Sequence, residues 1–121
     1  MPMPTPIKPV KNNLFLLNKD QISLPPLPET FEELPGTTSQ ITIERIVSAG
    51  QTSPQTGWYQ QARHEWVLLV QGQASIAFDD GSVCQLAAGD YLFIPKETKH
   101  KVVATTATPP CIWLAIHYPD D

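Results

Sequence analysis

The sequence predicts an all-β protein whose strands form an antiparallel sandwich or barrel. From Gln40 onward, short apolar segments alternate with turn signals at regular spacing, and no helical period of apolar residues interrupts them. The turn signals combine glycine, proline or aspartate and stand at Ala49-Gly50, Gln71-Gly72, Asp79-Asp80-Gly81, Ala88-Gly89-Asp90 and Pro109-Pro110. Short strands without intervening helices bury their apolar faces by packing as two sheets on one core.

Length and charge limit the class of protein. A chain of 121 residues with 41% hydrophobic residues is enough for one domain with one core. The net charge of −4 provides no basic stripe, so nucleic acid is not an expected partner. The N-terminus lacks the pattern of a signal peptide, and no run approaches the roughly 20 apolar residues of a membrane span. We expect a soluble, cytoplasmic protein without a membrane partner.

The first third of the chain, residues 1–39, is expected to form a proline-rich arm. Seven of the thirteen prolines fall within the first 28 residues, where they favour extended backbone over helix. The apolar segment at 13–17 could pair as an edge strand, so the arm is expected to pack on the barrel or on a partner subunit. Thr30 and Glu33 have the spacing of a capping box, which predicts a single helical turn before Pro35-Gly36.

Residues 40–121 are expected to form the barrel. Each predicted strand is rich in apolar residues and ends at a turn signal. Asp80-Gly81 predicts a hairpin, because this pair tolerates the positive φ angles of a type I′ turn. In chain order, strands are predicted at 41–48, 57–61, 65–71, 74–78, 82–86, 91–94, 100–105 and 111–118. The two cysteines, Cys84 and Cys111, lie inside such segments and are expected to be buried free thiols.

Polar residues in strands that otherwise predict burial indicate a pocket. Glu65 precedes the apolar run 66–70, and His100 opens a strand after Pro95. Because side chains alternate along a strand, an unbroken strand places four residues on one face, namely Tyr59, Gln61, Arg63 and Glu65. His64 then points away from that face, although one β-bulge would reverse this assignment.

Two motifs in this region resemble those of the cupin family, over about residues 40–118. In the first motif of cupins, a glutamate stands seven positions before a glycine, as Glu65 stands before Gly72. In the second motif, a glycine is followed by a proline, a second glycine and a histidine. The chain matches it with Gly89, Pro95 and His100, whereas Glu97 occupies the position of the second glycine. The resemblance implies a double-stranded β-helix, or jelly-roll barrel.

The first motif departs from the family at its two metal-binding histidines. Depending on the spacing, their positions hold either Tyr59 and Gln61 or Trp58 and Gln60. The resemblance then implies a ligand set of Gln61, Glu65 and His100 for one divalent ion with modest affinity. Its oxygen-rich donors suit Mn or Fe, with Ni or Zn as further candidates.

Two classes of function remain open for this pocket. One is an enzyme, an isomerase, epimerase or dioxygenase-like cupin that acts on a small polar metabolite, with Glu65 and His100 as metal ligands or as base and acid. Tyr59 and Arg63 would then contact the substrate, with Arg63 binding an anionic group, although a surface salt bridge is the more common role of an arginine. The other is a non-catalytic module that binds a small molecule or another protein. His117 could reach the pocket rim or bond a backbone carbonyl.

The segment 66–70 would place apolar side chains on both faces of a strand. Such a strand needs cover on both faces, which one small barrel does not supply by itself. We therefore expect either the arm or a second copy of the chain on the outer face, with a homodimer as the expected assembly.

Overall fold

The computed structural model describes residues 8–18, 21 and 29–121. In this part of the chain, eight strands form, and they are β1 (Thr30–Glu33), β2 (Thr42–Ser48), β3 (His64–Gln71), β4 (Gln73–Phe78), β5 (Val83–Ala87), β6 (Tyr91–Ile94), β7 (His100–Thr105) and β8 (Cys111–Tyr118). The described residues form no helix long and apolar enough to cross a bilayer.

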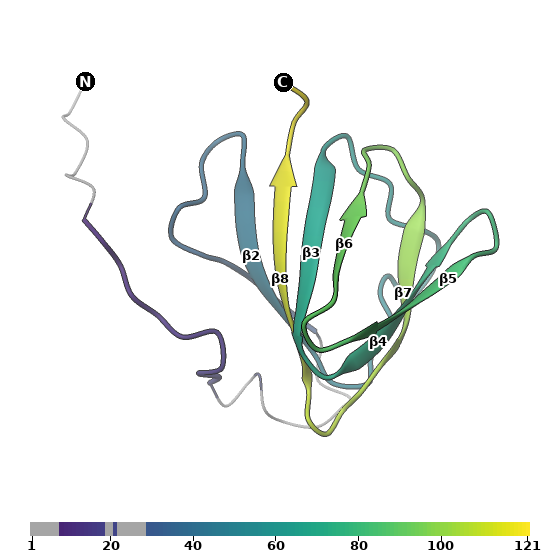
Figure 1. Ribbon diagram of the computed structural model, residues 1–121, viewed down its shortest axis with the longest axis horizontal. Helices are drawn as coiled ribbons and strands as arrows, with labels where there is room; N and C mark the ends of the chain where they lie inside the picture. Colours follow the sequence, from purple (N-terminus) through teal and green to yellow (C-terminus); the bar gives the residue numbers. More distant parts are fainter. Residues whose placement is uncertain (1–7, 19–20, 22–28) are drawn as a thin grey trace.

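The strands build two antiparallel sheets, which confirms the predicted jelly-roll barrel. One sheet has the order β1-β2-β8-β3-β6 and the other has the order β5-β4-β7. Gly72 lies between β3 and β4 and so joins the two sheets. In Figure 1, the sheets come together at this lower end and spread apart toward the upper ends of β3 and β7.

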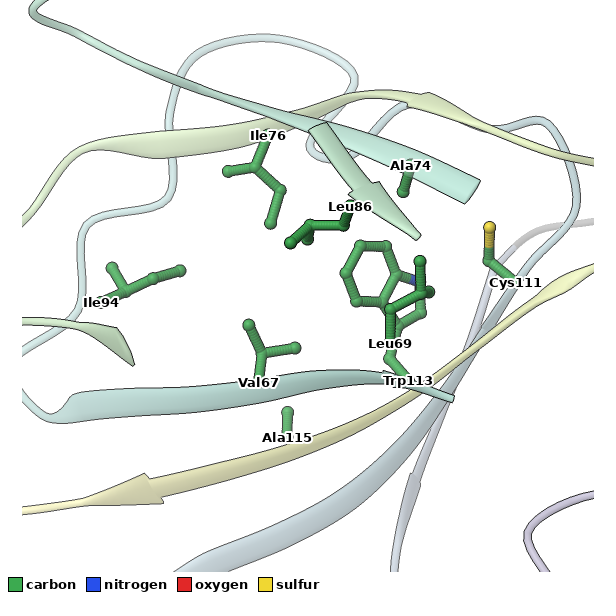
Figure 2. Packing of buried hydrophobic residues seen from close by; sticks show 9 residues of the cluster. All are labelled: Val67, Leu69, Ala74, Ile76, Leu86, Ile94, Cys111, Trp113 and Ala115. Atoms are coloured by element: carbon green, nitrogen blue, oxygen red, sulfur yellow. The ribbon is translucent and has the colours of Figure 1, made fainter. Parts of the chain in front are cut away.

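The hydrophobic core lies between the facing sheets. Figure 2 shows side chains of β3 and β8 opposite those of β4 and β5. The alternation of buried positions in β3 and β4 places one side chain in two in this core, as the period of a strand requires. Its buried members are Val67, Leu69, Ala74, Ile76, Leu86, Ile94, Cys111, Trp113 and Ala115. Both cysteines are free, but only Cys111 is fully buried.

Three local predictions were wrong. Thr30–Glu33 is a strand and not a helical turn, because its backbone pairs with β2 from Val47 to Glu44. Segment 57–61 is not a strand, and within it only Tyr59 forms an isolated bridge, with His100. Segment 13–17 contains a turn and no edge strand. In the first two cases, the conformation depends on backbone pairing with residues distant in sequence, which a local sequence pattern does not reveal.

The predicted hairpin at Asp80-Gly81 forms with a different turn. Phe78 N–H donates to Ser82 C=O across a three-residue loop, and β4 pairs with β5 on either side. Gly81 has a φ of 91°, whereas Asp80 is not in the left-handed region. A type I′ turn needs positive φ at both positions, so this loop instead resembles a type I turn followed by a left-handed glycine.

The arm contacts the β1–β2 edge of the large sheet through Arg45. This side chain is only 8% exposed and its Nη1 donates to the carbonyl oxygens of Leu14 (3.0 Å) and Leu16 (2.8 Å). Its Nε donates to Glu32 Oε1 at 2.7 Å, and Nη2 contacts Gln21 Oε1 at 3.3 Å. One buried guanidinium thus ties the segment around Leu14 and Leu16 to β2 and to β1, the part of the arm that pairs with the large sheet.

Glu97 occupies a backbone position that favours glycine. Its φ is 65°, in the left-handed region, where an L side chain costs about 1–2 kcal/mol. We expect Glu97→Gly to raise the free energy of unfolding by about 0.5–1 kcal/mol, after the greater entropy of glycine in the unfolded chain is subtracted. Urea denaturation measures this change. Glu97→Ala keeps the strained φ, so an equal gain from alanine would contradict the backbone explanation.

Candidate functional site

A cavity of about 340 Å³ lies between the two sheets. Its volume is at the lower end of the range of ligand pockets, which suits a small metabolite. The described residues that line it come from both sheets and are Glu29, Phe31, Glu44, Ile46, Ser53, Tyr59, Gln61, Glu65, Val67, Ile76, Ile94, His100, Val102, Trp113 and His117.

Glu65 and His100 meet in this cavity from different sheets. Glu65 is the second residue of β3 and shares the inward parity of Val67 and Leu69. His100 opens β7, where it pairs with Phe78 of β4 and bridges to Tyr59. The Glu65 Oε1 and His100 Nε2 atoms are 3.3 Å apart, with side chains only 12% and 7% exposed. The two groups that the sequence singled out therefore share one cavity.

The backbone orients the His100 ring. Its Nδ1 lies 2.9 Å from the carbonyl oxygen of Thr98, which can only accept, so Nδ1 carries the hydrogen and Nε2 faces Glu65. Glu65 Oε1 is buried and accepts no well-aligned hydrogen bond from the described residues, so its contact with His100 is an ion pair rather than a directed bond. An acceptor of this kind is open to a ligand.

Opposing effects act on the protonation of His100. Burial lowers the pKa of the imidazole, but the Glu65 carboxylate and the Thr98 carbonyl outweigh burial and raise the pKa above its ordinary value. A raised pKa in the folded state means that this group stabilises the fold fully below its unfolded pKa. The contribution is lost as the pH rises through the folded pKa.

We expect Glu65→Gln to lower the pKa of His100, because burial then acts without the opposing carboxylate. A two-dimensional NMR titration of the histidine rings measures this shift, with His64 as the reference outside the cavity. An unchanged His100 titration in the variant would show that Glu65 does not control its protonation.

His117 and Glu44 extend the pair to four groups. His117 Nε2 lies 3.0 Å from Glu44 Oε1 and 3.9 Å from Glu65 Oε2. His117 thus lines the cavity and bonds a carboxylate, rather than the backbone carbonyl that was one alternative. His117 lies on the same face of β8 as the buried residues Trp113 and Ala115, so the alternation of the strand could have predicted that it points inward. Glu44 was missed, because β2 carries both polar and apolar residues on each face and its sequence does not tell which face is inside.

Three further sequence candidates have different positions. Tyr59 and Gln61 line the cavity, and the Tyr59 hydroxyl hydrogen-bonds the Ser53 hydroxyl. Arg63 lies outside the cavity wall, where its Nη1 donates to Gln40 C=O at 3.1 Å and to Thr42 Oγ1 at 3.0 Å. The strand begins only at His64, so the strict alternation assumed for 59–65 does not extend to Arg63.

His64 also lies outside the cavity. Its Nε2 contacts Asp120 and its Nδ1 accepts from the Lys96 backbone N–H at 3.0 Å. The orientation expected for an unbulged strand is therefore the one observed.

A divalent ion would meet an incomplete donor set here. Glu65 and His100 have the spacing of two neighbouring ligands, since bonds of roughly 2.1 Å place ligand atoms about 3 Å apart. However, no three His, Cys, Asp or Glu side chains of the described residues form a metal-binding group. His117, the nearest further imidazole, is held by Glu44 at 3.0 Å. A metal site at Gln61, Glu65 and His100 thus depends on the Gln61 amide oxygen and stays a prediction.

Comparisons with known proteins give consistent matches. A family model described as a cupin domain matches residues 45–117. The solved structure of a provisionally assigned mannose-6-phosphate isomerase from Ralstonia eutropha JMP134 is 33% identical, with a TM-score of 0.81 over 93% of this chain and 100% of that one. A cupin superfamily protein from Desulfitobacterium hafniense DCB-2 has 20% identity and a TM-score of 0.64, over 77% and 79% of the two chains.

A more distant match shares the fold alone. The DMSP lyase DddQ from Ruegeria pomeroyi DSS-3 is 18% identical, with a TM-score of 0.57 over 69% of this chain and 40% of that one. A search among curated proteins gives no match. Since proteins with different reactions share this barrel, the residues of the cavity and not the fold decide the reaction.

Proposed function

Because the chain belongs to the cupin family, we propose that its barrel cavity binds a small polar metabolite and moves a proton on it, as an isomerase or epimerase does. One observation carries this proposal. A buried carboxylate and a buried imidazole, Glu65 and His100, face each other at 3.3 Å in a cavity of about 340 Å³. A titratable group in a pocket whose pKa is shifted by a neighbouring charge, as that of His100 is by Glu65, is a candidate for acid or base catalysis.

The two groups have complementary roles in such a transfer. Glu65 Oε1 has no well-aligned hydrogen bond among the described residues, and in its role as the base it accepts a proton from a carbon next to a carbonyl group. The electron pair of the broken C–H bond then moves toward the carbonyl oxygen, which takes a proton from Nε2 of the protonated His100. For the isomer, Glu65 returns the proton to the former carbonyl carbon, while the hydroxyl on the neighbouring carbon gives its proton to His100 and becomes the new carbonyl group. For the epimer, the planar intermediate turns over in the cavity before Glu65 returns the proton to the opposite face of the same carbon, and the oxygen returns its proton to His100. The raised pKa of His100 favours its role as the acid.

Two considerations support this reading. The Ralstonia eutropha protein, which is 33% identical to this chain, is provisionally assigned as an isomerase. A dioxygenase-like reaction requires a resident metal, whereas a proton transfer by Glu65 and His100 uses only side chains of this chain. The second candidate is a non-catalytic module that binds the same kind of small molecule.

Deuterium exchange tests the proposal whichever product is formed. The protein is incubated in D₂O with D-mannose, D-mannosamine and mannose 6-phosphate, and NMR follows the hydrogen on the carbon next to the carbonyl. We expect exchange that falls about 10²–10⁴-fold in Glu65→Gln and in His100→Gln. His64→Gln, a histidine outside the cavity, is the matched control and retains exchange. Binding of these sugars without exchange would favour the non-catalytic module.

We further propose that the cavity takes up one divalent ion, of Mn, Fe, Ni or Zn, through Gln61, Glu65 and His100 if it acts as a metal cupin. Elemental analysis of protein purified without chelators measures the stoichiometry. Loss of a bound ion in Glu65→Ala and His100→Ala supports the set. A wild-type protein that takes up no ion after reconstitution contradicts it.

The outer face of the large sheet supports the proposal of a homodimer. Tyr91 and Phe93 on β6 are 67% and 48% exposed, and the Tyr91 ring stacks on Trp66 of β3 at 5.5 Å. Exposed aromatic patches of this kind mark interaction surfaces. Sedimentation at micromolar concentration decides the point, since a monomer would contradict a dimer and Phe93→Glu should weaken one.

A further inference from the structure

We propose that the cavity selects a ligand that carries a positive charge, such as a small amine, over neutral or phosphorylated ligands of similar size. This inference rests on the proposed binding function and adds the chemical class of the ligand. The charges, the unpartnered acceptor and the aromatic side chains of the cavity wall support it.

The charge of the wall is negative. Glu29, Glu44 and Glu65 line the cavity, and none of the described lining residues is lysine or arginine. The two histidines on the wall leave it negative even if both are protonated, because three carboxylates face two imidazoles. In a cavity whose apolar walls hold back water, such a wall repels anions and attracts cations more strongly than an exposed surface would.

The cavity contains a buried hydrogen-bond acceptor that has no well-aligned donor. Glu65 Oε1 is buried and without a hydrogen-bond partner among the described residues. An ammonium group offers three donors and no acceptor, so it matches this oxygen. A phosphate offers mainly acceptors and would place negative oxygens beside a carboxylate. This oxygen, whose described neighbour is His100 Nε2 at 3.3 Å, therefore suits a hydrogen-bond donor. An ammonium or guanidinium group also supplies the positive charge that a neutral hydroxyl lacks.

Aromatic rings complete the wall. Phe31, Tyr59 and Trp113 line the same cavity as the three glutamates. Aromatic faces attract cations, and the attraction grows when water is excluded. The Tyr59 hydroxyl is within the field of the carboxylates. Burial raises the pKa of this phenol, the hydrogen bond with Ser53 lowers it, and Glu29, Glu65 and Glu44 raise it further.

This wall differs from what a phosphorylated sugar would need. Phosphate sites in proteins use arginine, lysine or helix N-termini. Arg63 is held outside the cavity by Gln40 and Thr42, and Arg45 is engaged by Glu32 and the carbonyls of the arm. The similarity to a provisionally assigned mannose-6-phosphate isomerase therefore does not extend to a phosphate group in this cavity.

Three probes with one carbon skeleton separate charge from shape. D-mannosamine carries an ammonium group, D-mannose is neutral and mannose 6-phosphate is anionic. NMR shifts of the His100 and His117 rings, measured at pH 6.5 during titration with each probe, give three dissociation constants. We expect mannosamine to bind at least about 10-fold more tightly than mannose, as one charge-assisted hydrogen bond provides, and mannose 6-phosphate to bind most weakly.

Two variants assign the preference to the wall. Glu44→Gln should reduce the affinity for mannosamine by about 10-fold and leave that for mannose nearly unchanged. Glu29→Gln provides a second variant that does not disturb the Glu44–His117 pair. Glu33→Gln is the matched control, because Glu33 is exposed on β1 and absent from the wall.

The outcomes separate this inference from the proposed function. If mannose or mannose 6-phosphate binds as tightly as mannosamine, the inference is overturned and the proposed function stands. If none of the three probes shifts the cavity histidines, the binding function itself fails, and the charge preference with it. A preference for mannosamine that Glu44→Gln and Glu29→Gln both leave intact would also overturn the inference.

Discussion

Replacement of Gly72 by alanine is expected to lower the free energy of unfolding by about 2–5 kcal/mol, which is a large part of the stability of a small domain. Gly72 has a φ of 95°, in the left-handed region. A Cβ at this position would lie 2.8 Å from Cys111 Sγ and 3.0 Å from Cys111 Cα. Backbone atoms cannot move aside as a flexible side chain can, so strain and overlap add. Urea denaturation measures the loss.

Gly81→Ala is the matched control for the contribution of overlap. Gly81 also has positive φ, at 91°, but an added Cβ there meets no atom within 4 Å. We expect this variant to lose only the backbone contribution, about 0.5–1 kcal/mol after the greater entropy of glycine in the unfolded chain is subtracted. Equal losses of unfolding free energy in the two variants would show that overlap of the added Cβ with Cys111 does not destabilise the fold. Since Gly72 joins the two sheets, Gly72→Ala also tests how tightly β3 must turn into β4.

Replacement of Arg45 by lysine is expected to release the arm and to lower the free energy of unfolding by about 2–3 kcal/mol. Lysine keeps the charge but cannot reach Leu14, Leu16 and Glu32 at once, as the planar guanidinium does. The expected loss is moderate, because the Glu32 side chain is 43% exposed and its ion pair is screened. Limited trypsin digestion at Lys11 reports release of the arm, and urea denaturation reports the loss of stability.

Arg63→Lys is the control for this substitution. Arg63 also donates to one backbone oxygen and one side chain, but in a partly exposed position away from the arm. We expect a change within about 0.5 kcal/mol and no new cleavage at Lys11. If Arg45→Lys leaves trypsin sensitivity at the level of Arg63→Lys, the arm is held by contacts other than this guanidinium.

The fold could be predicted because its information is local. Apolar runs between glycine and proline turns defined the strands of the barrel, and the motifs around Glu65 and His100 indicated the family. The wrong predictions concern segments whose conformation depends on pairing with residues distant in sequence. Thr30–Glu33 has a local capping signal, yet its backbone hydrogen bonds to β2 determine its conformation. No pattern within four residues contains that pairing.

A site residue could be predicted where it lies in a regular strand, because the alternation of the strand determines which side chains point into the barrel. Glu65 lies in β3, where Val67 and Leu69 define the inner face, and it lines the cavity. Arg63 lies before the strand begins, so the same rule failed for it. The sequence also did not reveal Glu44, whose strand carries apolar residues on both faces. The negative wall of the cavity consequently became visible only in three dimensions.

The Arg45 anchor matters for recombinant production of the protein. A fragment cut to the matched segment 45–117 would begin at the anchor itself and would lose β1, half of β2 and the carbonyls of Leu14 and Leu16. Its guanidinium would lack those acceptors, and strand β8 would expose unpaired backbone groups that invite aggregation. A soluble shortened version should therefore retain the arm, even though the family signature does not include it.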